Sequence, residues 1–331
     1  MKRVNINGTS VSILGDQHLG RRFVNGVPFH RRGEREAQQW ETFQRSLFDV
    51  EGVELHVNMG DVFDKYIVPP EVVLKVANLY IDAAERYSDV QFVVLRGNHD
   101  ASRDGGKASS FDLFSALVGY LRNVTVATAQ TELEINGNWF GFCGWCPFSS
   151  AKDVVDYLGT RRAYSAVFGH WDIESYGSDD THNLLPYEEL AKITNHVFTG
   201  HVHKAQEFER DGLHVTVTGS MMPYAHGEDD GETYVTLTPA EIEGKDLRDK
   251  CVRVLLQEGE EMPEGIDALQ VTYKRVVDGE TETVEIGEVE IAAFNMKTLF
   301  HDVMREVGVE EEPLAEAWAA YERLREESID A

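Results

Sequence analysis

Several features are absent from this sequence of 331 residues, and each absence narrows the classes of protein to which it can belong. No apolar run is long enough to span a bilayer, so we expect no membrane protein. The start, Met1-Lys2-Arg3, is followed by polar residues such as Asn5 rather than by the apolar core of a secretory signal, and we expect no signal peptide. No internal repeat and no low-complexity tract is found, which favours an ordinary globular chain.

Cysteine is scarce, with three residues in the whole chain. Cys143 and Cys146 form a Cys-x-x-Cys pair, but only Cys251 remains, so the sequence excludes a four-cysteine zinc site. An odd number of cysteines gives no disulfide framework and suits a reducing, cytoplasmic compartment. We therefore expect Cys143 and Cys146 to be buried in or beside a strand.

Positive charge is also in short supply. Lysine and arginine total 31, whereas aspartate and glutamate total 58, which gives a formal net charge of −27. Affinity for DNA comes largely from lysine and arginine side chains that neutralise phosphates and release counterions. A chain this acidic is expected to bind duplex DNA poorly on its own, unless bound metal ions or a partner protein supply the missing positive charge.

Five short stretches combine glycine with residue types that bind metals. They are Gly15-Asp16-Gln17-His18, Gly60-Asp61-Val62-Phe63-Asp64, Gly97-Asn98-His99-Asp100, Gly169-His170 and Gly200-His201-Val202-His203. Each follows an apolar run, rich in β-branched residues, that predicts a buried parallel strand; the runs cover residues 11–14, 55–59, 92–95, 166–168 and 197–199. Because ligands gather beyond the carboxyl ends of such strands, we expect the five motifs to meet at one rim.

The residue types in these motifs suit a pair of divalent cations. Two cations about 3.5–4 Å apart clamp a phosphate and lower the pKa of bound water. Mixed imidazole, carboxylate and amide ligands suit manganese, iron or zinc better than calcium or magnesium alone. Our candidate ligands are Asp16, His18, Asp61, Asn98, His170, His201 and His203. Seven side chains fill two sites if one carboxylate bridges, and Asp61 is our candidate for the bridge.

In order and spacing, the motifs resemble the calcineurin-like metallophosphoesterase superfamily over roughly residues 11–225. The resemblance implies an α/β fold, a layered α/β/β/α sandwich followed by a small capping module and terminal helices. It implies that one metal is held by Asp16, His18, Asp61 and His203, and the other by Asp61, Asn98, His170 and His201. It also implies a catalytic role for His99, which protonates or orients the leaving oxygen. Asp64 occupies the place where the nuclease branch of the superfamily keeps a His or Asp that orients this histidine. Two divalent ions are implied, manganese first, with iron, zinc or magnesium as alternatives.

Two details resemble the SbcD-like nucleases of DNA repair and recombination, which include nuclease subunits of phage recombination complexes. They are Asp16-Gln17-His18-Leu19-Gly20 and the stretch from Gly60 to Lys65 followed by Pro69-Pro70. This branch implies manganese-dependent 3′ to 5′ exonuclease and structure-directed endonuclease activity in a bacterial or phage-infected cell. It further implies an SbcC-like partner, an ABC-type ATPase with a long coiled coil, and leaves a homodimer open. Asp64 has a simpler alternative role, as a cap for the helix that begins near Pro70.

Several arginines lie near the motifs and are candidates for contacts to DNA phosphates. They are Arg21, Arg22, Arg31, Arg32 and Arg103. The alternative for each of them is an ordinary solvated surface position.

The sequence predicts three parts: a nuclease domain over residues 1–238, a small capping module over residues 239–292 and a helical segment over residues 293–331. Within the first part, helices are predicted over residues 34–48 and 70–87. Strands over 251–256, 269–277 and 281–289 build the module, and amphipathic helices over 296–307 and 313–327 follow. An exposed apolar helix face suits docking in a groove of the ATPase partner, whereas the alternative is packing on the chain's own domain.

Two other functions fit the same motifs. A small-molecule phosphodiesterase or phosphoprotein phosphatase shares the core and suits the acidic composition better, whereas the Asp64 motif, the arginines and the helical tail favour the nuclease. A non-catalytic metal-binding scaffold is the second alternative, although such proteins usually lose ligands and none is missing here.

Overall fold

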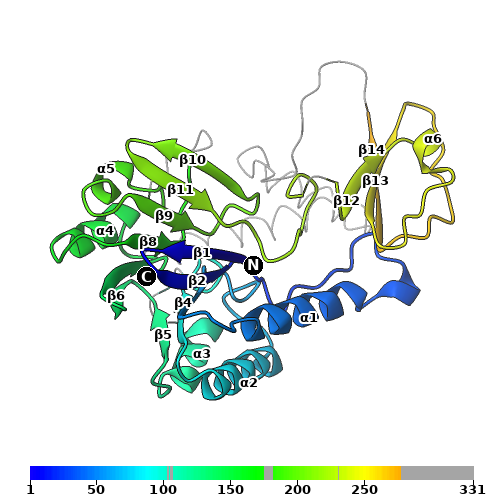
Figure 1. Ribbon diagram of the computed structural model, residues 1–331. Helices are drawn as coiled ribbons and strands as arrows, with labels where there is room; N and C mark the ends of the chain where they lie inside the picture. Colours follow the sequence, from blue (N-terminus) through cyan, green and yellow to red (C-terminus); the bar gives the residue numbers. More distant parts are fainter. Residues whose placement is uncertain (103, 105–106, 175–181, 230, 277–331) are drawn as a thin grey trace, which may run out of the picture. The chain divides into compact units, whose positions relative to one another are not determined.

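Two β-sheets packed face to face carry the motifs (Figure 1). The computed structural model describes residues 1–276, except for residues 103, 105–106, 175–181 and 230. The strand predicted over residues 281–289 and both tail helices therefore lie outside the described residues. The described part of the chain contains no helix with the length and apolar character of a membrane span.

The first sheet has five strands in sequence order, and all neighbours are parallel except the first pair. Its strands are β1 (Lys2–Ile6), β2 (Thr9–Leu14), β3 (Leu55–Asn58), β4 (Gln91–Leu95) and β5 (Val124–Ala127). The second sheet has the order β10-β11-β9-β8-β7-β6, with antiparallel pairs at both edges. Its strands are β6 (Gln130–Ile135), β7 (Asn138–Cys143), β8 (Ala166–Gly169), β9 (His196–Thr199), β10 (Gln206–Arg210) and β11 (Leu213–Val217).

Alternation along the strands builds the core between the sheets. In β2, Val11 and Ile13 face the second sheet, whereas Leu14 packs on the helical side. The second sheet contributes aromatic rings, and Phe168 stacks on Phe198 with ring centroids 4.9 Å apart. Successive strand residues point to opposite faces of the sheet. Each apolar run therefore contributes both to the core between the sheets and to the core under the helices.

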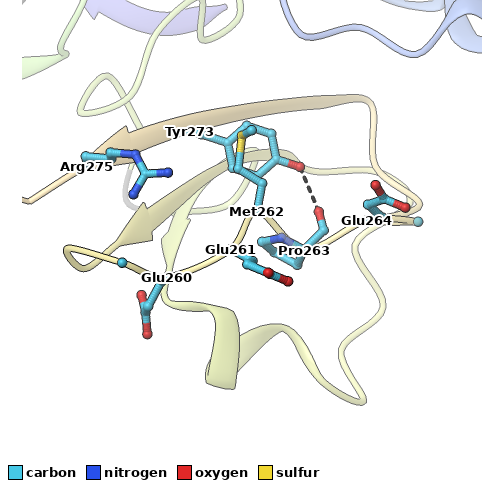
Figure 2. Close-up of a pocket in the computed structure, with 9 residues that line it drawn as sticks. Glu260, Glu261, Met262, Pro263, Glu264, Tyr273 and Arg275 are labelled. Atoms are coloured by element: carbon cyan, nitrogen blue, oxygen red, sulfur yellow. Dashed lines mark hydrogen bonds between the residues drawn. The ribbon is translucent and has the colours of Figure 1, made fainter.

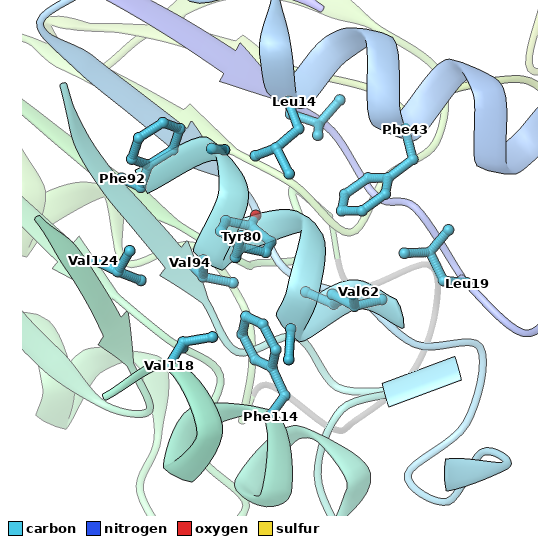
Figure 3. Packing of buried hydrophobic residues seen from close by; sticks show 14 of the residues in the cluster. Leu14, Leu19, Phe43, Val62, Tyr80, Phe92, Val94, Phe114, Val118 and Val124 are labelled. Carbon is cyan, nitrogen blue, oxygen red and sulfur yellow. The ribbon is translucent and has the colours of Figure 1, made fainter. Parts of the chain in front are cut away.

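Helices cover the outer faces of both sheets. The first sheet is covered by α1 (Glu34–Phe48), α2 (Pro70–Arg86) and α3 (Ser110–Val118), and the second by α4 (Ala151–Gly159) and α5 (Tyr187–Leu190). Tyr80 of α2 lies at the centre of the first helical layer, in ring contact with Phe43, Phe92 and Phe114 (Figure 3). The four layers confirm the predicted α/β/β/α sandwich, and the predicted helices over 34–48 and 70–87 are present.

A third, parallel sheet of three strands follows the sandwich. It contains β12 (Tyr234–Leu237), β13 (Cys251–Leu256) and β14 (Gln270–Arg275), with α6 (Pro239–Ile242) between the first two strands. The boundary predicted after residue 238 falls inside this sheet, because β12 pairs with β13. The division into three parts stays a prediction.

Candidate metal centre

The five motifs come together at one rim of the sandwich, where β2, β3, β4, β8 and β9 end. Hydrogen bonds donated by main-chain amides tie the motifs to one another. The amide of His18 donates to the main-chain oxygen of Asp61 at 2.8 Å, and the amide of His201 donates to the carboxylate oxygen Oδ2 of Asp16 at 2.9 Å. Both sheets therefore contribute to one cluster of polar side chains.

Three of the predicted ligands lie on left-handed backbone. The φ angles are 49° at His18, 49° at Asp61 and 73° at His201. Residues other than glycine rarely adopt this conformation, and it recurs where a function requires a particular side-chain direction. Here it turns each side chain toward the rim directly after its strand.

Glycine is required where the motifs approach most closely. A methyl group at Gly97 would overlap the carboxylate of Asp61, and one at Gly200 would lie 2.7 Å from Asp16 Oδ1. Only a residue without Cβ lets the turns pack this tightly.

The first group of candidate ligands contains Asp16, His18 and His203. The Nε2 atoms of His18 and His203 are 2.9 Å apart, and His203 Nε2 lies 3.8 Å from Asp16 Oδ2. Asp61 Oδ2 lies 3.8 Å from His18 Nε2, which places Asp61 beside this group as well.

The second group contains Asp61, Asn98, His170 and His201. Asn98 Oδ1 lies 3.0 Å from His170 Nε2 and 2.9 Å from His201 Nδ1. His170 Nε2 is 3.5 Å from Asp61 Oδ2. The structure thus brings together all seven predicted ligands, with Asp61 between the two groups, and their role as ligands stays a prediction.

The geometry of both groups fits divalent cations. Two donors about 2.1 Å from one cation and at a right angle to each other are about 3.0 Å apart, which is the spacing seen in both groups. His170 Nδ1–H donates to the Met59 oxygen at 2.9 Å, and its Nε2 faces the oxygen of Asn98. In the absence of a cation Nε2 carries a proton, which Asn98 Oδ1 accepts. Asp16 Oδ1 is also buried without a hydrogen-bond partner in the described structure.

The buried charges of the site perturb one another. Burial lowers the pKa of His170, but the charge of Asp61, the hydrogen bond with Asp61 and the charge of Asp16 together outweigh burial and raise that pKa to about 10. Burial acts to raise the pKa of Asp61, yet the charges of His170, His18 and His99 and the hydrogen bond with His170 together outweigh it, and the pKa is lowered. Burial raises the pKa of Asp16 to about 6 and lowers that of His18 to about 3. A cation held by these groups would take the place of the proton on His170, which would link metal binding to proton release.

The model of one protein family, the calcineurin-like phosphoesterases, matches residues 10–205, more than half of the chain. The chain belongs to this family. Members of the family hydrolyse phosphate esters with divalent metal ions, so the protein is a metal-dependent phosphoesterase. No curated protein matches the chain.

Among solved structures, the phosphoesterase is similar to an archaeal phosphodiesterase, with 15% identity and a TM-score of 0.31 over 63% of this chain and 83% of that one. It is also similar to a dimetal phosphatase from Danio rerio, with 12% identity and a TM-score of 0.40 over 64% of this chain and 88% of that one. Both TM-scores are below 0.5, so neither likeness supports a more specific conclusion.

Two acidic residues that the sequence did not single out support the histidines of the phosphoesterase centre. Glu228 Oε1 accepts a hydrogen bond from His203 Nδ1 at 3.0 Å, and Asp172 Oδ1 lies 2.7 Å from His201 Nε2. Carboxylates in this position orient metal-binding imidazoles and increase their basicity. Asp172 follows His170 by two residues, and this closeness to a predicted ligand could have indicated its role. Nothing in the sequence around Glu228 indicates that it contacts a ligand.

His99 and Asp64 are neighbours, as predicted, but the contact differs from the expected one. His99 Nδ1 donates to the main-chain oxygen of Asp64 at 2.7 Å. The Asp64 carboxylate instead lies 3.7 Å from Arg21 Nη1. In this geometry the main chain of Asp64 supplies the acceptor, and the orienting role of the Asp64 side chain stays a prediction.

Asp100 connects the second and third motifs. Its carboxylate accepts hydrogen bonds from the amides of Val62, Phe63 and Gly97 at 2.9–3.1 Å. Burial and the charge of Asp61 raise the pKa of Asp100 to about 8, against these three amide donors. The side chain thus fixes the turns that carry Asp61 and Asn98.

The predicted DNA-binding arginines do not form one group. Arg21 and Arg22 line a pocket of about 650 Å³ together with His99. Arg31 is not among the residues that line this pocket, and it lies 2.7 Å from Glu34 and 3.6 Å from Asp267. Its contact to DNA stays a prediction. Arg32 packs over the ring of Phe29. Arg103 lies outside the described residues.

A second cavity, of about 740 Å³, lies on the three-stranded sheet (Figure 2). Its lining includes Glu260, Glu261 and Glu264, and the Tyr273 hydroxyl donates to the Pro263 oxygen at 2.9 Å. None of the predicted ligands lines it, and its carboxylates would repel a phosphate. This cavity therefore has no part in the metal centre.

Proposed function

We propose that this phosphoesterase is a metal-dependent DNA nuclease that acts in recombination or repair, with 3′ to 5′ exonuclease and structure-directed endonuclease activity. The observation that carries the proposal is the basic flank of the metal centre. Arg21, Arg22 and Lys65 line the pocket that also contains Asn98 and His99. A substrate with phosphates on both sides of the reacting one gains from such a flank, whereas a small phosphate monoester does not.

The geometry of the site indicates which roles the metal ions and the side chains have in the reaction. When bound, two divalent cations neutralise the charge of the phosphate and activate water, and manganese is the proposed ion. The two ligand groups, joined at Asp61, would hold these ions. Glu228 and Asp172 keep His203 and His201 in the orientation that ligation needs.

His99 is the proposed proton donor to the leaving 3′-oxygen. Its Nδ1–H is held by the Asp64 main chain, so Nε2 is the nitrogen available to a substrate. The side chain is exposed and lines the pocket, unlike the buried ligand His170. A positioned imidazole of this kind typically contributes about 10²–10⁴-fold to a rate.

The net charge of −27 favours a second candidate, a phosphodiesterase or phosphatase that acts on small molecules or phosphoproteins. Long-range repulsion slows the approach of DNA and leaves a small substrate less affected. The two candidates share the metal centre and differ in what the basic flank binds.

The test is incubation of the purified chain with Mn²⁺ and either end-labelled single-stranded DNA or a bis-aryl phosphate. Shortening of the DNA supports the nuclease, and release of the aryl group alone supports the second candidate. Asp61→Asn should abolish either activity. Asp211→Asn is the matched control, because Asp211 is also an aspartate on left-handed backbone (φ 53°), on the exposed turn between β10 and β11.

We also propose that an SbcC-like ATPase partner binds residues 293–331, which lie outside the described residues. A positively charged partner surface would offset the acidity of this chain on DNA. The full chain should bind a purified SbcC-type ATPase in size-exclusion chromatography, and a chain ending at residue 292 should not. Equal binding by the two chains would contradict this docking segment.

A further inference from the structure

We propose that the pocket beside His99 is a subsite for the nucleoside that carries the leaving oxygen, and that Tyr66 is the platform on which its base stacks. The inference rests on the proposed nuclease function and specifies which part of the DNA strand this pocket holds. It concerns residues that neither ligate metal nor transfer protons.

The pocket opens directly onto the reacting centre. Asn98 and His99 line it together with Tyr66 and Ile67. Its volume of about 650 Å³ lies within the range of about 300–1,000 Å³ for small-molecule sites. Because His99 donates the proton to the leaving oxygen, the group attached to that oxygen is the part of the substrate nearest this pocket.

Two large apolar side chains are exposed there. Tyr66 is 42% exposed and Ile67 is 53% exposed, whereas the neighbouring Phe63 is fully buried. No ring contact to Tyr66 is formed within the described residues. An aromatic face beside a phosphate-binding centre is the arrangement with which proteins bind single-stranded nucleic acid, because every base has a face to stack.

The main chain around Tyr66 is held in place. The amide of Ser110 donates to the Tyr66 oxygen at 2.7 Å, and the amide of Val68 donates to Ser110 Oγ at 2.9 Å. The amide of Asp64 donates to the main-chain oxygen of Leu19 at 3.1 Å. The loop is therefore anchored at three points while its apolar side chains stay uncovered, which limits the entropy lost when a base binds.

Free positive charge lies next to the platform. Arg22 and Lys65 are exposed, and neither forms an ion pair with any described residue. Arg21, by contrast, lies over the Tyr224 ring with its guanidinium 5.2 Å from the centroid. A strand that stacks one base on Tyr66 brings its next phosphate within reach of these cations, so base and backbone are recognised together.

The test uses single-stranded oligonucleotides with one cleavable linkage, in three forms. One form is intact, one lacks the base on the nucleoside that supplies the 3′-oxygen, and one lacks the base on the other side of the phosphate. Tyr66→Ala should lower kcat/KM on the intact form about tenfold, within the range for removing one stacking aromatic. Tyr66→Phe should match the unaltered chain. Tyr157→Ala is the control, since Tyr157 is an exposed tyrosine on α4.

The decisive comparison is the form without the base on the 3′-oxygen side. The unaltered chain should lose about tenfold on it, and Tyr66→Ala should cause no further loss, because the two changes remove the same contact. If Tyr66→Ala lowers kcat/KM equally on all three forms, or on none of them, the subsite is contradicted while the proposed nuclease function is unaffected. If the unaltered chain hydrolyses a bis-aryl phosphate with Mn²⁺ but cleaves no oligonucleotide, the proposed function fails and the subsite fails with it. Manganese content and thermal melting of each variant establish that it is folded and loaded.

Discussion

A single main-chain oxygen sets the direction of the histidine proposed to transfer a proton. His99 is held through Nδ1 by the carbonyl of Asp64, which any residue at position 64 would supply. The Asp64 carboxylate contributes a pair with Arg21 at 3.7 Å, and partly exposed pairs of this kind are worth about 0–1 kcal/mol. The identity of the side chain at position 64 therefore has little influence on His99.

Two variants test this assignment together. His99→Asn should lower kcat at least about a hundredfold, because it removes the proton donor. Asp64→Ala should stay within about threefold of the unaltered chain, since the main-chain acceptor remains. Steady-state kinetics with metal analysis decides the matter. Loss of metal from His99→Asn would place His99 among the ligands, and an equal loss of activity in both variants would restore the orienting role of the Asp64 carboxylate.

A buried histidine away from the metal centre makes stability depend on pH. His56 of β3 is fully buried, its Nδ1 lies 2.7 Å from Ser12 Oγ, and its Nε2 has no hydrogen-bond partner in the described structure. Burial lowers the pKa of His56 to about 3. Below about pH 6.5 the unfolded chain binds a proton at this residue that the folded chain does not. The free energy of unfolding therefore decreases as the pH is lowered from about 6.5 to about 3.

His56→Gln should remove this contribution. Between pH 6 and pH 4, the free energy of unfolding of the unaltered chain should fall by about 1.4 kcal/mol per pH unit more than that of the variant. Urea unfolding in the presence of a chelator measures the difference without the contribution of metal release. His30→Gln changes an exposed histidine and should keep the original slope. Parallel slopes for the His56 variant and the unaltered chain would show that His56 does not titrate in this way.

At the scale of elements, turns after parallel strands place the ligands, and loops from elsewhere fix their orientation. The segment between β11 and β12 brings Glu228 to His203 Nδ1, and the same carboxylate accepts from the Tyr224 amide at 2.6 Å. One side chain thus ties this connection to a predicted ligand of the first group.

Glu228→Ala should weaken Mn²⁺ binding about 10–100-fold, because it removes the group that orients His203. Glu228→Gln retains an oxygen that can accept from Nδ1–H and should lose less. Isothermal titration with Mn²⁺ measures both variants, and Glu209→Ala on the exposed strand β10 serves as the control. Unchanged affinity in Glu228→Ala would mean that His203 is oriented by its own backbone.

The sequence predicted those parts of the fold and the site that depend on local pattern. Apolar runs followed by glycine marked β2, β3, β4, β8 and β9, because burial on both faces and a tight turn leave a clear signal. The partners of the ligands left none. Glu228 reaches His203 across 25 residues, and a glutamate in an acidic loop looks like any solvated charge. The hydrogen-bond acceptor of His99 could not be predicted either, because it is a main-chain oxygen and every residue type has one.

At the scale of the whole molecule, the metal centre joins the two sheets and is expected to stabilise them together. The first sheet carries Asp16, His18, Asp61 and Asn98, and the second carries His170, His201 and His203. Cations that bind the folded chain alone shift the unfolding equilibrium by mass action.

Mn²⁺ at 100 times its dissociation constant should stabilise the chain by about 2.7 kcal/mol. For a chain of this size, that corresponds to a rise in Tm of roughly 4 °C. Differential scanning fluorimetry with and without a chelator measures the rise. Asp61→Asn should show a much smaller rise, and Asp211→Asn should show the full one. The same rise in Asp61→Asn would place the stabilising ions somewhere else.

The distribution of ligands over both sheets also bears on the synthesis of the chain. A ribosome that has released the first sheet has produced four of the seven predicted ligands, and the last of them, His203, follows β9. A chain that ends before His203 therefore lacks part of the predicted centre. Phosphoesterase activity is thus expected only after both sheets have been synthesised.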